Sequence, residues 1–205
     1  MEKKGITLGG KKKARLTFNA PVTLTFTALC CAAFVLGLIF PVIKQHIFSV
    51  YRAPMSDPLT YLRLFGHVLG HKDLSHIIGN MMYILLLGPL LEEKYGAKSM
   101  ILSIAVTAVI TGVACMLFSD RGMLGASGVV FSFILMASFT AVKEKEIPLT
   151  TVLVAVLYIG QQIYNMISEG GNVAYGAHIL GGVTGGVMGW LLNKRSAGKK
   201  TSGIL

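Results

Sequence analysis

Long apolar runs alternate with short polar segments along most of the chain. A helix needs about 20 mostly apolar residues to cross the hydrocarbon core of a membrane. Six runs reach or approach that length, at residues 16–43, 74–91, 99–119, 122–142, 147–168 and 170–193. The pattern therefore predicts an all-α polytopic membrane protein with six transmembrane helices.

The connection between the first two runs, residues 44–73, is much longer than the other connections. Long loops inside compact domains are often functional. Residues 61–65 (Tyr-Leu-Arg-Leu-Phe) form an amphipathic stretch suited to a membrane interface. We therefore expect a long external loop between helices 1 and 2.

The composition agrees with a membrane domain. The chain has 205 residues, of which 53% are hydrophobic and 14% are charged, whereas a soluble domain carries about 25% charged residues. We expect one membrane domain at residues 16–193, with a basic cytoplasmic tail on each side, at residues 1–15 and 194–205.

The net charge of +10 bears on orientation rather than on nucleic acid, because the cations lie in the tails and between apolar runs. Cytoplasmic loops carry an excess of Lys and Arg. With the amino terminus inside, 14 cations lie inside (Lys3, Lys4, Lys11, Lys12, Lys13, Arg15, Lys94, Lys98, Lys143, Lys145, Lys194, Arg195, Lys199, Lys200) and five lie outside (Lys44, Arg52, Arg63, Lys72, Arg121). This distribution predicts a multi-pass protein of the cell membrane (inner or plasma membrane) with both termini cytoplasmic.

Four polar residues share one depth in this topology. The second, fourth and sixth runs all pass from outside to inside, and His76, Asn80, Ser127 and His178 lie near their starts. At a rise of 1.5 Å per residue, each lies within roughly 10 Å of the outer end of its helix. Polar residues inside membranes are costly and usually functional, so this convergence predicts a site.

Ser127 lies between two glycines, Gly125 and Gly128, in a Gly-Ala-Ser-Gly segment. Glycine allows a tight turn and the close approach of another chain. A serine at a helix amino terminus also has unpaired amide donors beside it, which can stabilise an oxyanion. Taken alone, such a segment is more often a helix-capping serine in a glycine-rich packing seam.

His178 is followed by Gly181 and Gly185, which are four residues apart. Such a pair of small residues lets two membrane helices approach closely, and can bring His178 within hydrogen-bond reach of Ser127. Taken alone, a histidine here is more often a buried, hydrogen-bonded residue.

His76 and Asn80 lie one helical turn apart and form a candidate pair of oxyanion donors. The histidine series His67, His71 and His76 also raises the possibility of a metal site. No H-E-x-x-H segment occurs, and no carboxylate lies in a span near these histidines. We therefore expect no metal.

These segments together resemble the rhomboid family of intramembrane serine proteases, in its minimal six-span bacterial form. The resemblance covers roughly residues 16–193, and its motifs are His67-x3-His71-x4-His76-x3-Asn80, Gly88-x3-Glu92-x3-Gly96, Gly125-x-Ser127-Gly128 and Ala177-His178-x2-Gly181-x3-Gly185.

The resemblance implies a protease with a Ser–His dyad and no cofactor. Ser127 is then the nucleophile and His178 the general base, while His76 and Asn80 bind the oxyanion with the backbone amide of Ser127. Phe131 occupies the place where the family often has a tyrosine stacked on the catalytic imidazole. The implied partners are the lipid bilayer and the transmembrane segments of other membrane proteins, which are cut in or near those segments.

Three positions depart from the family's usual pattern. Leu62-Arg63 stands where a Trp-Arg pair is often found, Lys94 replaces an arginine that often accompanies Glu92, and Phe131 replaces the tyrosine. We expect Arg63 still to bind loop carbonyls, and Lys94 to be a less directional partner for Glu92. Glu92 itself is expected to be structural.

Two other functions stay open on the sequence. One is a catalytically silent rhomboid-like protein that binds transmembrane helices, which usually lacks the serine or the histidine. The other is a small transporter or channel, which favours polar groups deeper in the bilayer than those found here. The oligomeric state is unknown from the sequence.

Overall fold

The computed structural model describes residues 17–142, 146–168 and 173–201, and these fold into helices joined by short connections. In chain order the elements are α1 (Pro21–Ile39), α2 (Pro41–His46), α3 (Pro58–Gly66), α4 (Leu74–Tyr95), α5 (Ala97–Phe118), α6 (Ser127–Ser138), the 3₁₀ helix η1 (Phe139–Ala141), α7 (Leu149–Ser168) and α8 (Val173–Thr201).

Four of the described helices, α1, α4, α5 and α7, are long and apolar enough to cross a membrane. α6 is also apolar but shorter. α8 is long, but it carries glycines and His178 in place of large aliphatic residues and is not among the four. This all-helical arrangement fits the predicted polytopic membrane protein, and many large apolar side chains face outward, as lipid contact requires.

The first predicted run, residues 16–43, forms two helices rather than one. α1 starts at Pro21 and ends at Ile39, and Pro41 then opens α2. Proline lacks a backbone N–H and is favoured in the first turn of a helix, so each proline marks a helix start. The length of the apolar run therefore overstates the length of the helix.

The fourth predicted run, residues 122–142, is helical only from Ser127 and not from residue 122 as its apolar character suggested. Val50 and Met123 exchange two backbone hydrogen bonds, of 2.9 and 2.8 Å, and the amide of Gly125 donates to the carbonyl of His67 at 2.9 Å. Gly125 also has a φ of +137°, which a helix does not allow. Bonds to distant segments thus hold this stretch as an extended loop.

The connection between α1 and α4 contains the short helices α2 and α3. Arg63 of α3 is 3% exposed, and it donates to the carbonyl of His46 at 3.0 Å and to the carboxylate of Asp57 at 2.9 Å. Its guanidinium also lies 4.5 Å from the centre of the Tyr51 ring. The expected bond from Arg63 to a loop carbonyl is therefore present, and Leu62 beside it is exposed.

Glu92 fastens α1 to the far end of α4. Its carboxylate accepts hydrogen bonds from the amides of Val22 and Thr23, at 2.8 and 2.9 Å, and from the Thr23 hydroxyl at 2.8 Å. A carboxylate at a helix amino terminus satisfies unpaired amides and complements the helix dipole. Lys94 instead donates to the carbonyl of Thr140, so the expected pairing of Lys94 with Glu92 is wrong.

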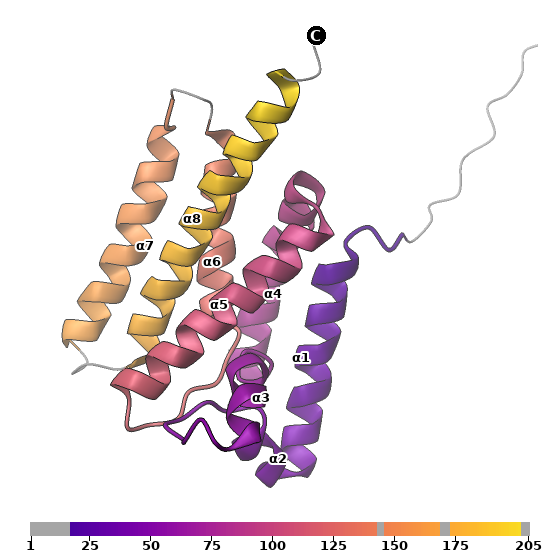
Figure 1. The fold of residues 1–205 in the computed structure, drawn as a ribbon, viewed down its shortest axis with the longest axis vertical. Helices are drawn as coiled ribbons and strands as arrows, with labels where there is room; N and C mark the ends of the chain where they lie inside the picture. The colour runs from indigo at the N-terminus through magenta and orange to yellow at the C-terminus, as the bar shows by residue number, and fades with distance from the viewer. Residues whose placement is uncertain (1–16, 143–145, 169–172, 202–205) are drawn as a thin grey trace, which may run out of the picture.

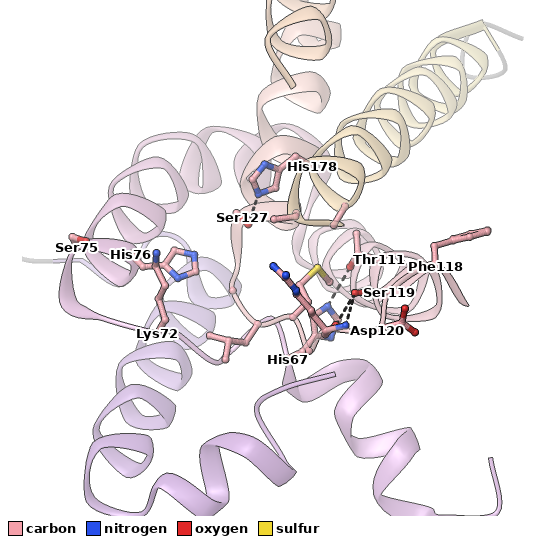
Figure 2. Close-up of a pocket in the computed structure, with 18 residues that line it drawn as sticks. His67, Lys72, Ser75, His76, Thr111, Phe118, Ser119, Asp120, Ser127 and His178 are labelled. Atoms are coloured by element: carbon pink, nitrogen blue, oxygen red, sulfur yellow. Dashed lines mark hydrogen bonds between the residues drawn. The ribbon is translucent and has the colours of Figure 1, made fainter. Parts of the chain in front are cut away.

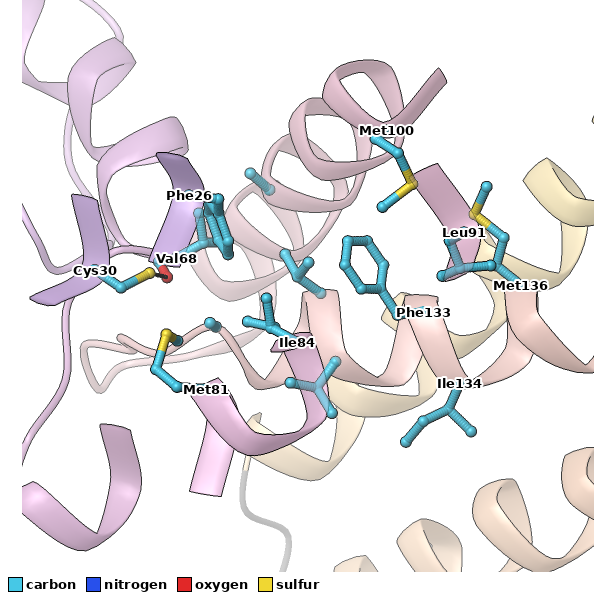
Figure 3. Close-up of a cluster of buried hydrophobic side chains, with 14 of the residues drawn as sticks. Phe26, Cys30, Val68, Met81, Ile84, Leu91, Met100, Phe133, Ile134 and Met136 are labelled. Carbon is cyan, nitrogen blue, oxygen red and sulfur yellow. Dashed lines mark hydrogen bonds between the residues drawn. The ribbon is translucent and has the colours of Figure 1, made fainter. Parts of the chain in front are cut away.

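α6 lies among α4, α5, α7 and α8 and packs most extensively against α8 (Figure 1). Its buried residues join the main apolar cluster with α1, α4 and α5 (Figure 3). The described chain starts and α8 ends at one end of the molecule, whereas α2 and α3 lie at the other end. The amino-terminal turns of α4, α6 and α8 line one shared cavity.

The predicted tails are described only in part. α8 continues to Thr201 and so extends past residue 193, where the membrane domain was expected to end. Lys194, Arg195 and Ala197 after Asn193 have high helix propensity, which lets the helix continue beyond its apolar part. Residues 1–15 and 202–205 lie outside the described part of the chain.

Candidate active site

Ser127 is the first residue of α6. Ala126 before it provides no side-chain cap for the first turn, so the amides of that turn are left for another acceptor. A Cβ atom at Gly125 would lie 2.7 Å from His76 Cε1, and φ there is already +137°. Only glycine suits this position, because it lets the loop turn into α6 directly beside the His76 ring.

Ser127 and His178 are hydrogen-bonded. The distance from Ser127 Oγ to His178 Nε2 is 2.8 Å, across the contact between α6 and α8 (Figure 2). The predicted approach of these two side chains is therefore found in the structure. A serine that donates to an imidazole nitrogen has the arrangement of an activated nucleophile and its base.

The close packing of α6 on α8 produces this contact. A Cβ atom at Gly181 would lie 2.2 Å from the carbonyl oxygen of Gly128, and one at Gly185 would lie 1.9 Å from that of Ser132. Both of these oxygens belong to the backbone, so neither can move away by rotation of a side chain. The expected role of Gly181 and Gly185 in close helix contact agrees with this geometry. A Cβ atom at Gly128 would in turn lie 3.2 Å from the methyl group of Thr111.

Aromatic rings hold the imidazole of His178 on two sides. The Phe131 ring stacks on it, with centres 4.6 Å apart and planes 15° apart, and Tyr175 meets it edge-on at 6.2 Å. The stacking expected of Phe131 is thus present without the tyrosine hydroxyl. Stacking limits rotation of the imidazole and keeps Nε2 directed at Ser127.

Gln162 of α7 contacts the other imidazole nitrogen. Its Oε1 lies 2.9 Å from His178 Nδ1, and its side chain is 7% exposed. The sequence interpretation did not single out this residue. The signal was nevertheless available, because Gln161-Gln162 is a polar pair inside an apolar run and polar residues in membrane spans mark functional positions.

The pair lies in a cavity of about 1000 Å³ that is lined from several elements. The starts of α4, α6 and α8, the end of α5 and the loop before Ser127 all contribute (Figure 2). Charged side chains also line it, namely Lys72, Asp120 and Arg121. The mixed polar lining suits a space that holds water and a peptide backbone.

The two predicted oxyanion donors are placed differently. His76 lines the cavity, and its Nδ1 is buried without a hydrogen-bond partner. Asn80 is 6% exposed, is not among the cavity-lining residues, and donates from Nδ2 to His71 Nε2 at 3.0 Å. The single cavity-facing pair expected from their spacing is therefore not formed here, because His71 engages the Asn80 amide. The oxyanion role of Asn80 stays a prediction.

His67 and His71 lie in the connection that leads into α4, and both make structural contacts. His67 bonds the carbonyl of Arg63 and the hydroxyl of Thr111, at 3.1 and 3.2 Å. Burial lowers the pKa of His67 to about 4, and burial with the nearby His76 lowers the pKa of His71 to about 4. Both rings are therefore neutral near pH 7. Within the described ranges, no three His, Cys, Asp or Glu side chains gather closely enough to hold a metal ion.

Comparison with known proteins gives concordant matches. Residues 58–195 match the family model described as the Rhomboid domain. The chain is 27% identical over 181 residues to the Rhomboid protease GlpG of Yersinia pestis (strain Pestoides F), and 25% identical over 184 residues to that of Yersinia enterocolitica serotype O:8. Each match covers 86% of this chain and 64% of the relative, so the chain spans less than two thirds of the length of these relatives.

Proposed function

Since the chain belongs to the rhomboid family, we propose that it is an intramembrane serine protease that uses a dyad of Ser127 and His178. The observation that carries the proposal is the 2.8 Å hydrogen bond between Ser127 Oγ and His178 Nε2 in a polar cavity. The relatives named as rhomboid proteases support the same reaction class.

The geometry suits acyl transfer through a covalent intermediate. Ser127 Oγ attacks the scissile carbonyl carbon while His178 Nε2 takes the hydroxyl proton. The tetrahedral intermediate then collapses, and Nε2 returns the proton to the leaving amine. A water molecule next attacks the acyl ester, loses its proton to Nε2, and releases the second product as Ser127 regains its hydrogen. No step in this cycle needs a cofactor.

The negative charge that forms on the carbonyl oxygen needs donors beside Ser127. The Ser127 amide lies at the amino terminus of α6, where the helix dipole also favours negative charge. Of the two predicted side-chain donors, His76 and Asn80, it is His76 that lines the cavity. Asn80 acts on the oxyanion only after release from His71, and otherwise helps to orient the segment that carries His76.

The proposed substrates are transmembrane segments of other membrane proteins. The backbone groups of a membrane helix are internally paired, so a segment must unwind locally to present a carbonyl to Ser127. Helix-weakening residues near the cut site therefore favour cleavage. The cavity that opens around the dyad supplies the water that hydrolysis requires.

The proposed topology has six spans, formed by α1, α4, α5, α6, α7 and α8 within a membrane domain at residues 16–193. Both termini then lie in the cytoplasm, and α2 and α3 lie at the outer side of the cell membrane. The excess of cations on the cytoplasmic side supports this orientation. Reporter domains fused to each terminus test it, and a terminus found outside refutes it.

Cleavage of a single-span membrane reporter tests the proposed activity. Wild-type protein in proteoliposomes cuts the reporter, whereas Ser127→Ala and His178→Ala each lose cleavage while they keep the same thermal unfolding profile. A fluorophosphonate probe labels Ser127 in the wild type and not in Ser127→Ala. Normal cleavage by either variant contradicts the dyad. A folded wild type without labelling or cleavage indicates instead the silent, helix-binding function.

A further inference from the structure

The imidazole of His178 has hydrogen-bond partners on both nitrogens. Ser127 Oγ lies 2.8 Å from Nε2, and Gln162 Oε1 lies 2.9 Å from Nδ1. A neutral imidazole carries one proton, on one nitrogen only. An amide oxygen can only accept, so Nδ1 carries the proton and donates it to Gln162 Oε1, which leaves Nε2 to accept from the Ser127 hydroxyl.

We propose that Gln162 is a positioning residue that selects the Nδ1-protonated tautomer of His178 and so keeps Nε2 free to accept the proton of Ser127. This inference rests on the proposed protease function. Gln162 takes the place of the carboxylate in a three-residue catalytic arrangement, but as a neutral amide.

The burial pattern of α7 supports a directed role for Gln162. α7 faces outward over most of its surface, and its two buried residues are Thr151 and Gln162, both polar. Thr151 donates to the carbonyl of Ser138 at 2.7 Å, and Gln162 bonds His178. A helix that needed only to pack would bury apolar side chains here, since a buried amide is costly without a partner.

The hydrogen bond between Gln162 and His178 also supports the reaction, and Gln162 itself does not react. When Nε2 takes the proton from Ser127, the imidazole becomes positively charged, and the Nδ1–H donates to an oxygen that carries partial negative charge. When Nε2 later gives its proton to the leaving amine, the imidazole returns to the Nδ1-protonated tautomer. Gln162 neither gains nor loses a proton.

Matched variants separate this role from simple space filling. Gln162→Met keeps the length of the side chain and removes the acceptor, whereas Gln162→Glu keeps an oxygen that accepts in either protonation state. Gln161→Met is the control, because Gln161 is exposed and bonds Asn165 of its own helix.

The first measurement is nitrogen-15 NMR of histidine-labelled protein in detergent, with the His178 signals assigned from a His178→Ala sample. We expect the proton on Nδ1 in the wild type and in Gln161→Met, and a loss of that preference in Gln162→Met. A wild-type proton on Nε2, or an unchanged tautomer in Gln162→Met, overturns the proposal. This measurement does not depend on protease activity, so it stands apart from the fate of the proposed function.

The second measurement is reporter cleavage. We expect kcat to fall about tenfold in Gln162→Met, with KM changed by less than about twofold, since one orienting hydrogen bond is lost. Gln162→Glu and Gln161→Met stay within about threefold of the wild type. A space-filling role predicts the reverse order, with an active Met variant and an inactive Glu variant, and that order overturns the proposal.

Discussion

A single methyl group added at Gly181 tests whether helix packing sets the distance between Ser127 and His178. Gly181 lies about one turn after His178 on α8 and faces α6. A Cβ atom there would lie 2.2 Å from the carbonyl oxygen of Gly128 and 2.9 Å from its carbonyl carbon. Because both are backbone atoms of α6, Gly181→Ala requires the two helices to separate.

The required separation can be worked out from these contacts. Moving the Cβ atom from 2.2 Å to the 3.4 Å of ordinary van der Waals contact needs about 1.2 Å. The same displacement of His178 lengthens its 2.8 Å bond to Ser127 to about 4 Å, which is no longer a hydrogen bond. A misplacement of about 1 Å can cost about 100-fold in rate, so we expect kcat to fall by about that factor.

Gly182→Ala is the matched control, because it adds the same methyl group to the same helix one residue later. A Cβ atom at Gly182 meets Leu135 at 3.5 Å, an ordinary contact. Cleavage of the single-span reporter in proteoliposomes gives kcat for both variants, and thermal unfolding in detergent shows whether each is folded. Equal rates for folded Gly181→Ala and Gly182→Ala would refute the packing argument.

Three further predictions concern the rest of the site. Asn80→Ala is expected to reduce reporter cleavage less than Ser127→Ala does, because the proposed oxyanion donors at the Ser127 amide and His76 remain; a loss as complete as that of Ser127→Ala contradicts the ranking. Glu92→Ala lowers the unfolding temperature in detergent, since three donors at the start of α1 lose their acceptor, and an unchanged temperature argues against this clamp. Wild-type protein loses stability as the pH falls from 7 to 5, because the pKa of folded His67 is about 4 against 6.5 when unfolded, so the unfolded state takes up the proton first. His67 contributes about 2 kcal/mol to that loss of stability. The unfolding temperature of His67→Gln should therefore depend less on pH than that of the wild type. Identical curves of unfolding temperature against pH would rule out this role of His67.

The apolar pattern predicted the long helices well where nothing interrupts them. Residues 74–91 and 99–119 were expected to be helical, and α4 and α5 span Leu74–Tyr95 and Ala97–Phe118. The pattern failed where local chemistry or distant bonds intervene. Pro41 divides the first run, and the bonds from Val50 to Met123 keep residues before Ser127 out of a helix. The hydropathy of a segment reflects how unfavourable its contact with water is, and it contains no information about hydrogen bonds to distant segments.

The close approach of Ser127 to His178 could also be predicted from the sequence. Gly125 and Gly128 flank the serine, and Gly181 and Gly185 follow the histidine at the spacing of a close helix contact. Because glycines at this spacing expose the backbone along one side of a helix, the residues themselves specify which faces of α6 and α8 can meet. Composition and cation placement likewise sufficed to predict a membrane domain.

Only the tertiary structure decided which polar groups share the site. Asn80 and His76 lie one turn apart, yet Asn80 bonds His71 while His76 faces the cavity. Gln162, from a helix with no motif, reaches the second nitrogen of His178. The reason is that any apolar face of a helix is equally stable against lipid. The rotation and depth of a membrane helix are therefore set by its contacts with other helices. The contacts of Asn80 with His71 and of Gln162 with His178 depend on this packing, and no glycine pattern like that of α6 and α8 marks them in the sequence.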